Sequence, residues 1–189
     1  MEEQKLEAMR KQEKESKRLG GRMLNILGKL QRNQTHRDMS TSGIELGTLR
    51  ARILINNVYN NKSLYCMSMT RQHTEDEVGV DLARMLMINK TVRKIELEGN
   101  KLGPKTAREF AYLLRLTTTL KYLDVENNQL TSDGDDISGV LALADALKVN
   151  KSLVSLNMAN NNLDDVVGKA IVEAMEHNYT LIDLEFGFN

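Results

Sequence analysis

Apolar positions recur along residues 61–189 in a unit of about 28 residues. Each unit carries an aliphatic anchor, and the anchors are Leu64, Val92, Leu120, Leu153 and Leu181. Successive anchors are 28, 28, 33 and 28 residues apart. An Asn-x-Ser/Thr triplet precedes every anchor except Leu120, which follows three threonines. A register kept over five units predicts an internal repeat that builds one continuous fold.

Each unit alternates apolar and polar residues after its anchor and then changes to a helical period. The alternation from Val92 to Leu97 predicts a short strand with one buried face. A polar turn follows, and a helical face then recurs at Ala107, Phe110, Leu113 and Leu114, at Val140, Leu143, Ala144 and Leu147, and at Val167, Ala170, Ile171 and Ala174. No unit buries its apolar face alone, so the units are predicted to stack into an α/β solenoid, with parallel strands on the concave side and helices on the convex side.

One asparagine in each of the last four units stands eight residues after the anchor. These residues are Asn100, Asn128, Asn161 and Asn189, and Gln72 takes the equivalent place in the first unit. Where a strand turns away, an amide side chain bonds backbone groups that the turns leave unpaired. We therefore predict a structural asparagine ladder along the solenoid.

The unit resembles the leucine-rich repeat, L-x-x-L-x-L-x-x-N-x-L, at the longer period of the ribonuclease-inhibitor-like class. More narrowly, the chain resembles the repeat domain of tropomodulins and leiomodins. The stretches that carry this resemblance are Asn61 to Val92, Leu123 to Asn128, and Phe186-Gly187-Phe188. The resemblance implies protein binding and no enzyme activity.

The pattern divides the chain into three regions. Residues 1–35 are predicted to form a charged helical extension, 36–43 a linker, and 44–189 the repeat domain. The repeat domain is expected to start with a capping helix over 45–58, followed by repeats that start near 61, 89, 117, 150 and 178. The third unit holds five extra residues around 131–137. No polar cap follows Asn189, which favours the leading part of a longer protein over an end that a partner covers.

Composition excludes several classes of protein. The 26 Lys/Arg residues balance the 26 Asp/Glu residues, so no overall field would attract nucleic acid or an acidic membrane. Residues 1–38 hold ten Lys/Arg against six Asp/Glu, a net of +4, so residues 39–189 carry −4. The single cysteine, Cys66, fits a reducing compartment. The chain shows neither a signal-peptide core nor an apolar run of membrane-spanning length, so a cytoplasmic location is expected.

No motif in the chain predicts catalysis or a cofactor. The three histidines His36, His73 and His177 are scattered, and Cys66 has no neighbouring base. The acidic run Asp133, Asp135 and Asp136 lacks the spacing of a calcium loop and instead suits a helix N-terminus. Whether this insertion is a contact loop stays open. The Asn-x-Ser/Thr asparagines are predicted to be helix caps in the left-handed conformation, in preference to glycosylation sites.

Two partner-binding surfaces are candidates. The first comprises the outward strand positions of the concave face, which are Lys94, Glu96, Glu98, Tyr122, Asp124, Glu126, Ser155, Asn157, Asp183 and Glu185. Its six carboxylates suit a basic partner segment, and a merely solvated face is the equal alternative. The second is an apolar stripe with flanking cations near the N-terminus, comprising Arg22, Met23, Ile26, Leu27, Lys29 and Leu30. We favour a protein-docking helix there over a disordered tail or a membrane-surface helix.

These features predict a non-enzymatic scaffold or adaptor in a cytoskeletal assembly, without nucleic-acid, membrane or small-molecule partners. An axonemal, microtubule-associated complex in the cilium is our first expectation, because residues 1–35 show no heptads for pairing with a tropomyosin coil. One alternative is an actin pointed-end regulator of the tropomodulin type. Another is an inhibitor of a basic enzyme, by analogy with ribonuclease inhibitor. Fold alone does not choose among them.

Overall fold

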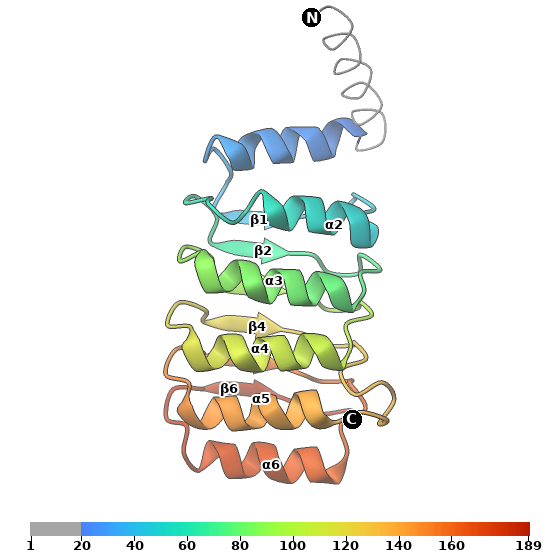
Figure 1. The fold of residues 1–189 in the computed structure, drawn as a ribbon, viewed down its shortest axis with the longest axis vertical. Coiled ribbons are helices and arrows are strands. Elements are labelled where there is room, and N and C mark those ends of the chain that lie inside the picture. The colour runs from blue at the N-terminus through green and yellow to red at the C-terminus, as the bar shows by residue number, and fades with distance from the viewer. Residues whose placement is uncertain (1–19) are drawn as a thin grey trace, which may run out of the picture.

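Six short parallel strands form one sheet in chain order, and helices line one side of it (Figure 1). The computed structural model describes residues 20–189. The strands are β1 (Asp38–Ser40), β2 (Cys66–Ser68), β3 (Lys94–Glu96), β4 (Tyr122–Asp124), β5 (Ser155–Asn157) and β6 (Asp183–Glu185). The labelled helices are α2 (Gly47–Asn56), α3 (Asp76–Ile88), α4 (Pro104–Leu116), α5 (Ser138–Val149) and α6 (Asp165–Met175).

The strands pair so that equivalent residues of successive units are neighbours. The central residue of each of the first five strands is buried, and these residues are Met39, Met67, Ile95, Leu123 and Leu156. The residues on either side of each central residue point to the opposite face, because side chains alternate along a strand. The predicted α/β leucine-rich repeat solenoid is therefore confirmed.

Small residues bring neighbouring helices close together. A Cβ atom added at Gly139 of α5 would lie 2.4 Å from the Pro104 carbonyl oxygen of α4. One added at Gly79 of α3 would lie 2.1 Å from the Thr106 hydroxyl oxygen. Between these close approaches, Phe110, Leu113 and Leu114 pack into one continuous core. The helical periodicity predicted from the sequence places these residues on the correct face.

Residues 36–43 are not simply the predicted linker, because residues 38–40 form β1. Met39 pairs with Met67 and is 8% exposed, so it belongs to the core. The helix predicted over 45–58 consequently has a strand of its own and completes an ordinary unit. Met39 lies 28 residues before Met67, yet it is the lone large apolar residue among Ser, Thr and Gly, a composition typical of loops.

The apolar stripe of the N-terminal helix (residues 20–31) is also not available for a partner. Met23, Leu27 and Leu30 are at most 8% exposed and join the core of the first unit, with Ile26 packed against them. Of the flanking cations, Arg22 donates to the Gly43 carbonyl oxygen and Lys29 is exposed. The proposed docking surface is thus used within the chain, because it covers apolar side chains that the end of the stack would otherwise expose. Residues 1–19, the rest of the predicted extension, lie outside the described residues.

Asparagine amides bridge successive turns at the strand-to-helix edge. The Asn128 Nδ2 donates to the carbonyl oxygens of Leu97 and Val125, both at 3.0 Å. Its Oδ1 accepts from the Leu102 N–H at 3.0 Å. The same pattern of carbonyl and N–H partners recurs at Asn100, Asn161 and Asn189. Each side chain therefore joins its own turn to the preceding one.

A second row of asparagines bridges successive turns at the helix-to-strand edge. The Asn89 Nδ2 donates to the carbonyl oxygens of Val58 and Asn61 at 2.8 Å, and its Oδ1 accepts from the N–H groups of Thr91 and Val92. The predicted left-handed conformation is wrong, because Asn89 has φ −69° and ψ 124°. The side chain makes the required contacts, so the backbone stays extended. All four members of this row, Asn61, Asn89, Asn150 and Asn178, are at most 7% exposed, which leaves no accessible amide for glycosylation.

Replacing Asn128 with Ala should lower the free energy of unfolding by about 1–3 kcal/mol, since buried backbone groups of two successive turns lose their partners. Thermal or urea unfolding measures this change. Gln129→Ala, at the exposed neighbouring position, is the control and should have little effect. Equal midpoints for the two variants would contradict the bridging role.

Adding one methyl group should have opposite effects in α5 and α6. Gly139→Ala is expected to destabilise the fold by about 1–3 kcal/mol, because its Cβ has no room beside Pro104. Gly168→Ala should stabilise it by about 0.5–1 kcal/mol, because nothing lies within 4 Å of its Cβ position and alanine favours the helix. Unfolding curves of both variants test the contrast, and a shift of the same sign would contradict it.

Candidate functional site

The predicted concave residues gather in two rows across β3 to β6. One row runs through Lys94, Tyr122, Ser155 and Asp183, and the other through Glu96, Asp124, Asn157 and Glu185. These eight residues line a shallow hollow of about 230 Å³. Glu98 and Glu126 follow β3 and β4 in the adjoining turns. The structure thus brings most of the predicted residues together on one surface.

Two of the six carboxylates have cationic partners. The Lys94 Nζ lies 2.6 Å from the Glu96 Oε1, and the Arg71 Nη2 lies 2.7 Å from the Glu98 Oε1. Sequence analysis missed Arg71 because it lies outside the strand positions. Its signal is its place one residue before Gln72 of the ladder, in the turn that leads away from β2. These pairs reduce the negative charge at the β3 side of the face.

The remaining carboxylates, Asp124, Glu126, Asp183 and Glu185, form what we call the acidic patch. Within residues 20–189 none of them makes an ion pair. The Asn157 Nδ2 donates to the Glu126 Oε2 at 2.8 Å, and the Ser155 hydroxyl donates to the Asp183 Oδ2 at 2.8 Å. Neutral donors therefore orient two of these carboxylates and leave their charge in place.

Asp124 is the most constrained member of the acidic patch. Burial raises the pKa of its carboxyl above the ordinary value, and the nearby carboxylates of Glu126, Glu98 and Glu96 raise the pKa further. The Glu126 N–H donates to its Oδ1 at 3.0 Å and acts in the opposite direction. The ionised form of Asp124 is consequently disfavoured where it stands, and a nearby cation would favour it.

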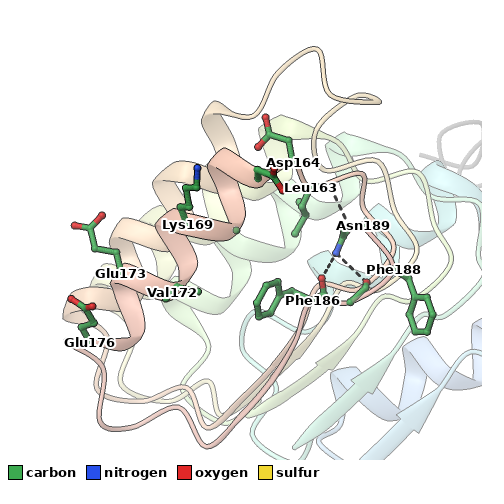
Figure 2. Close-up of a pocket in the computed structure, with 12 residues that line it drawn as sticks. Leu163, Asp164, Lys169, Val172, Glu173, Glu176, Phe186, Phe188 and Asn189 are labelled. Carbon is green, nitrogen blue, oxygen red and sulfur yellow. Dashed lines mark hydrogen bonds between the residues drawn. The ribbon is translucent and has the colours of Figure 1, made fainter.

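The surface at the β6 end of the described solenoid combines apolar and charged side chains. A hollow of about 760 Å³ lies between α6 and the segment after β6, and its lining includes Leu163, Val172 and Phe186. Figure 2 shows Phe186 on the side toward α6, whereas Phe188 points away from it. Phe188 is 93% exposed. The lining also includes five charged residues, Asp164, Asp165, Lys169, Glu173 and Glu176, so this hollow is less apolar than the faces along which the preceding helices pack.

The described residues give no support for metal binding. They contain no group of three or more His, Cys, Asp or Glu side chains placed to hold an ion. In the 131–137 insertion, Asp136 accepts from Ser138 and pairs with Arg108, and Asp133 accepts from Asn162. These carboxylates thus stabilise the loop itself. None of the helices in residues 20–189 combines the length and apolarity needed to cross a bilayer.

Sequence comparison links the chain to known repeat proteins. A family model described as Leucine Rich repeat matches residues 118–134 and 149–172. Leiomodin-2 from Mus musculus is 32% identical over 82 residues, which are 43% of this chain and 14% of leiomodin-2. Ribonuclease inhibitor from Sus scrofa is 30% identical over 146 residues, which are 72% of this chain and 29% of the inhibitor. The chain thus spans less than a third of the length of either relative.

Solved structures share the same architecture. The tropomodulin C-terminal domain of Caenorhabditis elegans superposes with a TM-score of 0.63 at 16% identity, over 83% of this chain and 93% of that domain. Leiomodin-1 actin-binding site 2 superposes with a TM-score of 0.52 at 18% identity, over 87% of this chain and 79% of its own. At these identities the likeness concerns the fold. Together with the family-model match, the repeat register and the single parallel sheet, it shows that the chain folds as an α/β leucine-rich repeat solenoid, similar in sequence to ribonuclease inhibitor and leiomodin-2.

Proposed function

We propose that this chain is a non-enzymatic binding domain whose partner is actin, which would place it in the cytoskeleton. The observation that carries this proposal is its similarity, over 87% of its length, to leiomodin-1 actin-binding site 2. No comparison supports the axonemal or ciliary interpretation that we expected first. That expectation rested on the missing heptads of residues 1–35, and heptads have no bearing on whether the repeats themselves bind actin.

We place the contact on the concave face, at the acidic patch. Asp124 ionises against burial and three neighbouring carboxylates, so a Lys or Arg side chain from the partner would relieve an unfavourable arrangement. The half-buried Asp124 and Glu126 are separated from the exposed Asp183 and Glu185 by Ser155 and Asn157 of β5, so the acidic patch offers a cationic segment two pairs of carboxylates on alternate strands. Charge complementarity of this kind contributes mainly to the association rate and to specificity.

Co-sedimentation of the 189-residue chain with actin filaments tests the proposal. Pyrene-labelled actin monomers form a second arm, and microtubules form a third. We expect binding to filaments or monomers and none to microtubules. Binding to microtubules alone, or to none of the three, would overturn the actin assignment.

A second candidate function is inhibition of a basic enzyme. The observation that favours it is 30% identity with ribonuclease inhibitor across 72% of the chain, together with the acidic patch. Pancreatic ribonuclease activity measured with increasing amounts of the chain decides the matter. If ribonuclease activity is lost at an equimolar amount of the chain, and the chain does not bind actin, this function is favoured over the first.

Reversing two charges of the acidic patch should weaken actin binding. We expect Asp124→Lys with Glu126→Lys to raise the Kd about tenfold at low salt and less at high salt, because salt screens the lost attraction. The measurement is filament affinity across a salt series. Asp183→Lys with Glu185→Lys, at exposed positions of the same face, repeats the test with less risk to folding.

The control for charge reversal is Glu77→Lys with Asp135→Lys, which changes net charge equally at exposed positions outside the concave strands. Its affinity should stay close to that of the wild type. An unchanged affinity in both concave variants would remove the contact from the concave face, while leaving actin binding itself intact.

Neutralising Asp124 should stabilise the fold at neutral pH. A raised carboxyl pKa means that, between 3.8 and the raised value, the folded state binds more protons than the unfolded state. Stability therefore falls as pH rises through this window. Asp124→Asn keeps an oxygen for the Glu126 N–H and removes the charge, so its melting temperature should exceed that of the wild type at neutral pH.

The same variant should gain less stability than the wild type on mild acidification. Thermal melts at several pH values measure both effects, with Asp135→Asn as the exposed control. A melting temperature of Asp124→Asn below that of the wild type at neutral pH would show that the carboxylate is favourably held.

A further inference from the structure

The two edges of the solenoid carry opposite charge. Along the edge where helices lead into strands, at the left in Figure 1, the connecting segments hold Arg37, Lys62, Lys90, Arg93, Lys121 and Lys151. We call these six residues the basic edge. From residue 33 to 182, the one carboxylate in the connecting segments of this edge is Glu176. From β1 to α6, the strand-to-helix segments of the other edge hold eight carboxylates against two cations, Arg71 and Lys101.

Backbone hydrogen bonds hold part of the basic edge in a row. The N–H of Arg93 donates to the Tyr65 carbonyl oxygen at 2.8 Å, and the N–H of Lys121 donates to the Arg93 carbonyl oxygen at 2.8 Å. The Arg37 guanidinium lies over the Tyr65 ring, 4.9 Å from its centroid. Successive members of the row are thus about one strand spacing apart, roughly 4.8 Å.

An exposed apolar row runs beside these cations. Ile88, Leu116 and Val149 are the last residues of α3, α4 and α5, and they are 61%, 59% and 54% exposed. They occupy equivalent positions in three successive units, directly before the segments that carry the basic edge. The surface therefore combines a cationic track with aliphatic side chains in the same register.

The helix dipole explains some of this charge. The Lys90 Nζ donates to the Met87 carbonyl oxygen at 2.6 Å, as expected of a cation at a helix C-terminus. Arg93 and Lys121 follow beyond the last helical turn, where the dipole has little effect. Lys62, Lys121 and Lys151 make no ion pair with any described residue. The Arg93 guanidinium donates to the Thr119 carbonyl oxygen at 3.3 Å, so half of the basic edge, Lys62, Lys121 and Lys151, is left without a structural role that these contacts explain. The dipole also gives no reason for the apolar row.

We propose that the basic edge binds an acidic segment of another protein that carries aliphatic side chains among its carboxylates. The carboxylates would pair with the cationic track, and the aliphatic side chains would cover Ile88, Leu116 and Val149. The opposite edge repels the same segment, so binding is confined to one side of the solenoid. This surface is distinct from the concave face, and the inference does not depend on the proposed actin contact.

Two other polyanions fit the observations less well. A nucleic acid backbone presents phosphates without aliphatic groups, so it would leave the apolar row exposed. An anionic membrane requires apolar side chains that insert below the headgroups. Ile88, Leu116 and Val149 are single aliphatic side chains one unit apart, each followed by a cationic segment, so they do not form the continuous apolar face of a membrane-inserting surface. A protein segment accounts for both rows.

Fluorescence anisotropy with labelled synthetic peptides tests the proposal on the 189-residue chain. The probes are a peptide of repeated Glu-Glu-Leu and one of repeated Glu-Glu-Ser with the same charge. The triple variant Lys62→Glu, Lys90→Glu, Lys151→Glu should raise the Kd for the leucine peptide about tenfold or more at low salt, as expected for three lost ion pairs. The wild type should bind the serine peptide severalfold more weakly than the leucine peptide, because the serine side chains do not bury the apolar row.

The matched control is Lys101→Glu, Lys105→Glu, Lys169→Glu, which makes the same charge change at exposed positions away from the basic edge. It should stay within about twofold of the wild type. If circular dichroism shows that the first variant does not fold, glutamine at the same three positions replaces it, with a severalfold loss expected. Asp124→Lys with Glu126→Lys should bind the peptide as the wild type does, which separates this result from the actin contact.

Three results would overturn the proposal. These are no peptide binding by the wild type at low salt, equal losses in the basic-edge and control variants, and tighter binding of phosphatidylserine vesicles or of a single-stranded oligonucleotide than of the leucine peptide. Equal affinity for the leucine and serine peptides would overturn the part assigned to the apolar row.

Discussion

Buried amide groups that bridge backbone turns are the interaction on which this solenoid depends. A short strand, a turn and a helix leave carbonyl and N–H groups unpaired at both edges of every unit, and burying such groups is costly. Asparagines on both edges meet this requirement, and within residues 20–189 no buried side-chain nitrogen or oxygen lacks a partner. The bonds reach from one unit to the next, so they also fix the register that the strands and helices share.

Because the register is fixed, equivalent residues of successive units line up in rows. The concave hollow, the basic edge and the apolar row each consist of equivalent positions repeated along the stack. The helices run in the same direction, so their negative ends all lie along one edge, and each end favours cations within its last turn. Part of the charge separation between the two edges therefore follows from topology. The cations beyond the helix ends add to it and extend the field outward.

The repeat made most of the fold predictable, because spacing, alternation and helical period agree in the units from Leu64 onward. The prediction of secondary structure failed where a single apolar residue was the only indication of a strand. Met39 alone marks β1, and its surroundings have the composition of a loop. The stripe at Met23, Leu27 and Leu30 was recognised, but sequence does not reveal whether an apolar stripe packs on its own chain or on another. Periodicity likewise placed the concave residues correctly, whereas the partner of Glu98 depends on the reach of the Arg71 side chain.

The small residues between the helices affect how closely the helical layer matches the spacing of the sheet. Neighbouring strands are about 4.8 Å apart, whereas packed helices are usually 8–10 Å apart, and this mismatch bends a solenoid toward its sheet. Gly79 and Gly139 let adjacent helices approach more closely than larger side chains would allow. A smaller spacing between neighbouring helices reduces this bend, which gives a wider arc and a shallower concave face. Such a face can lie against a broad, gently convex object, and it would fit poorly around a narrow one.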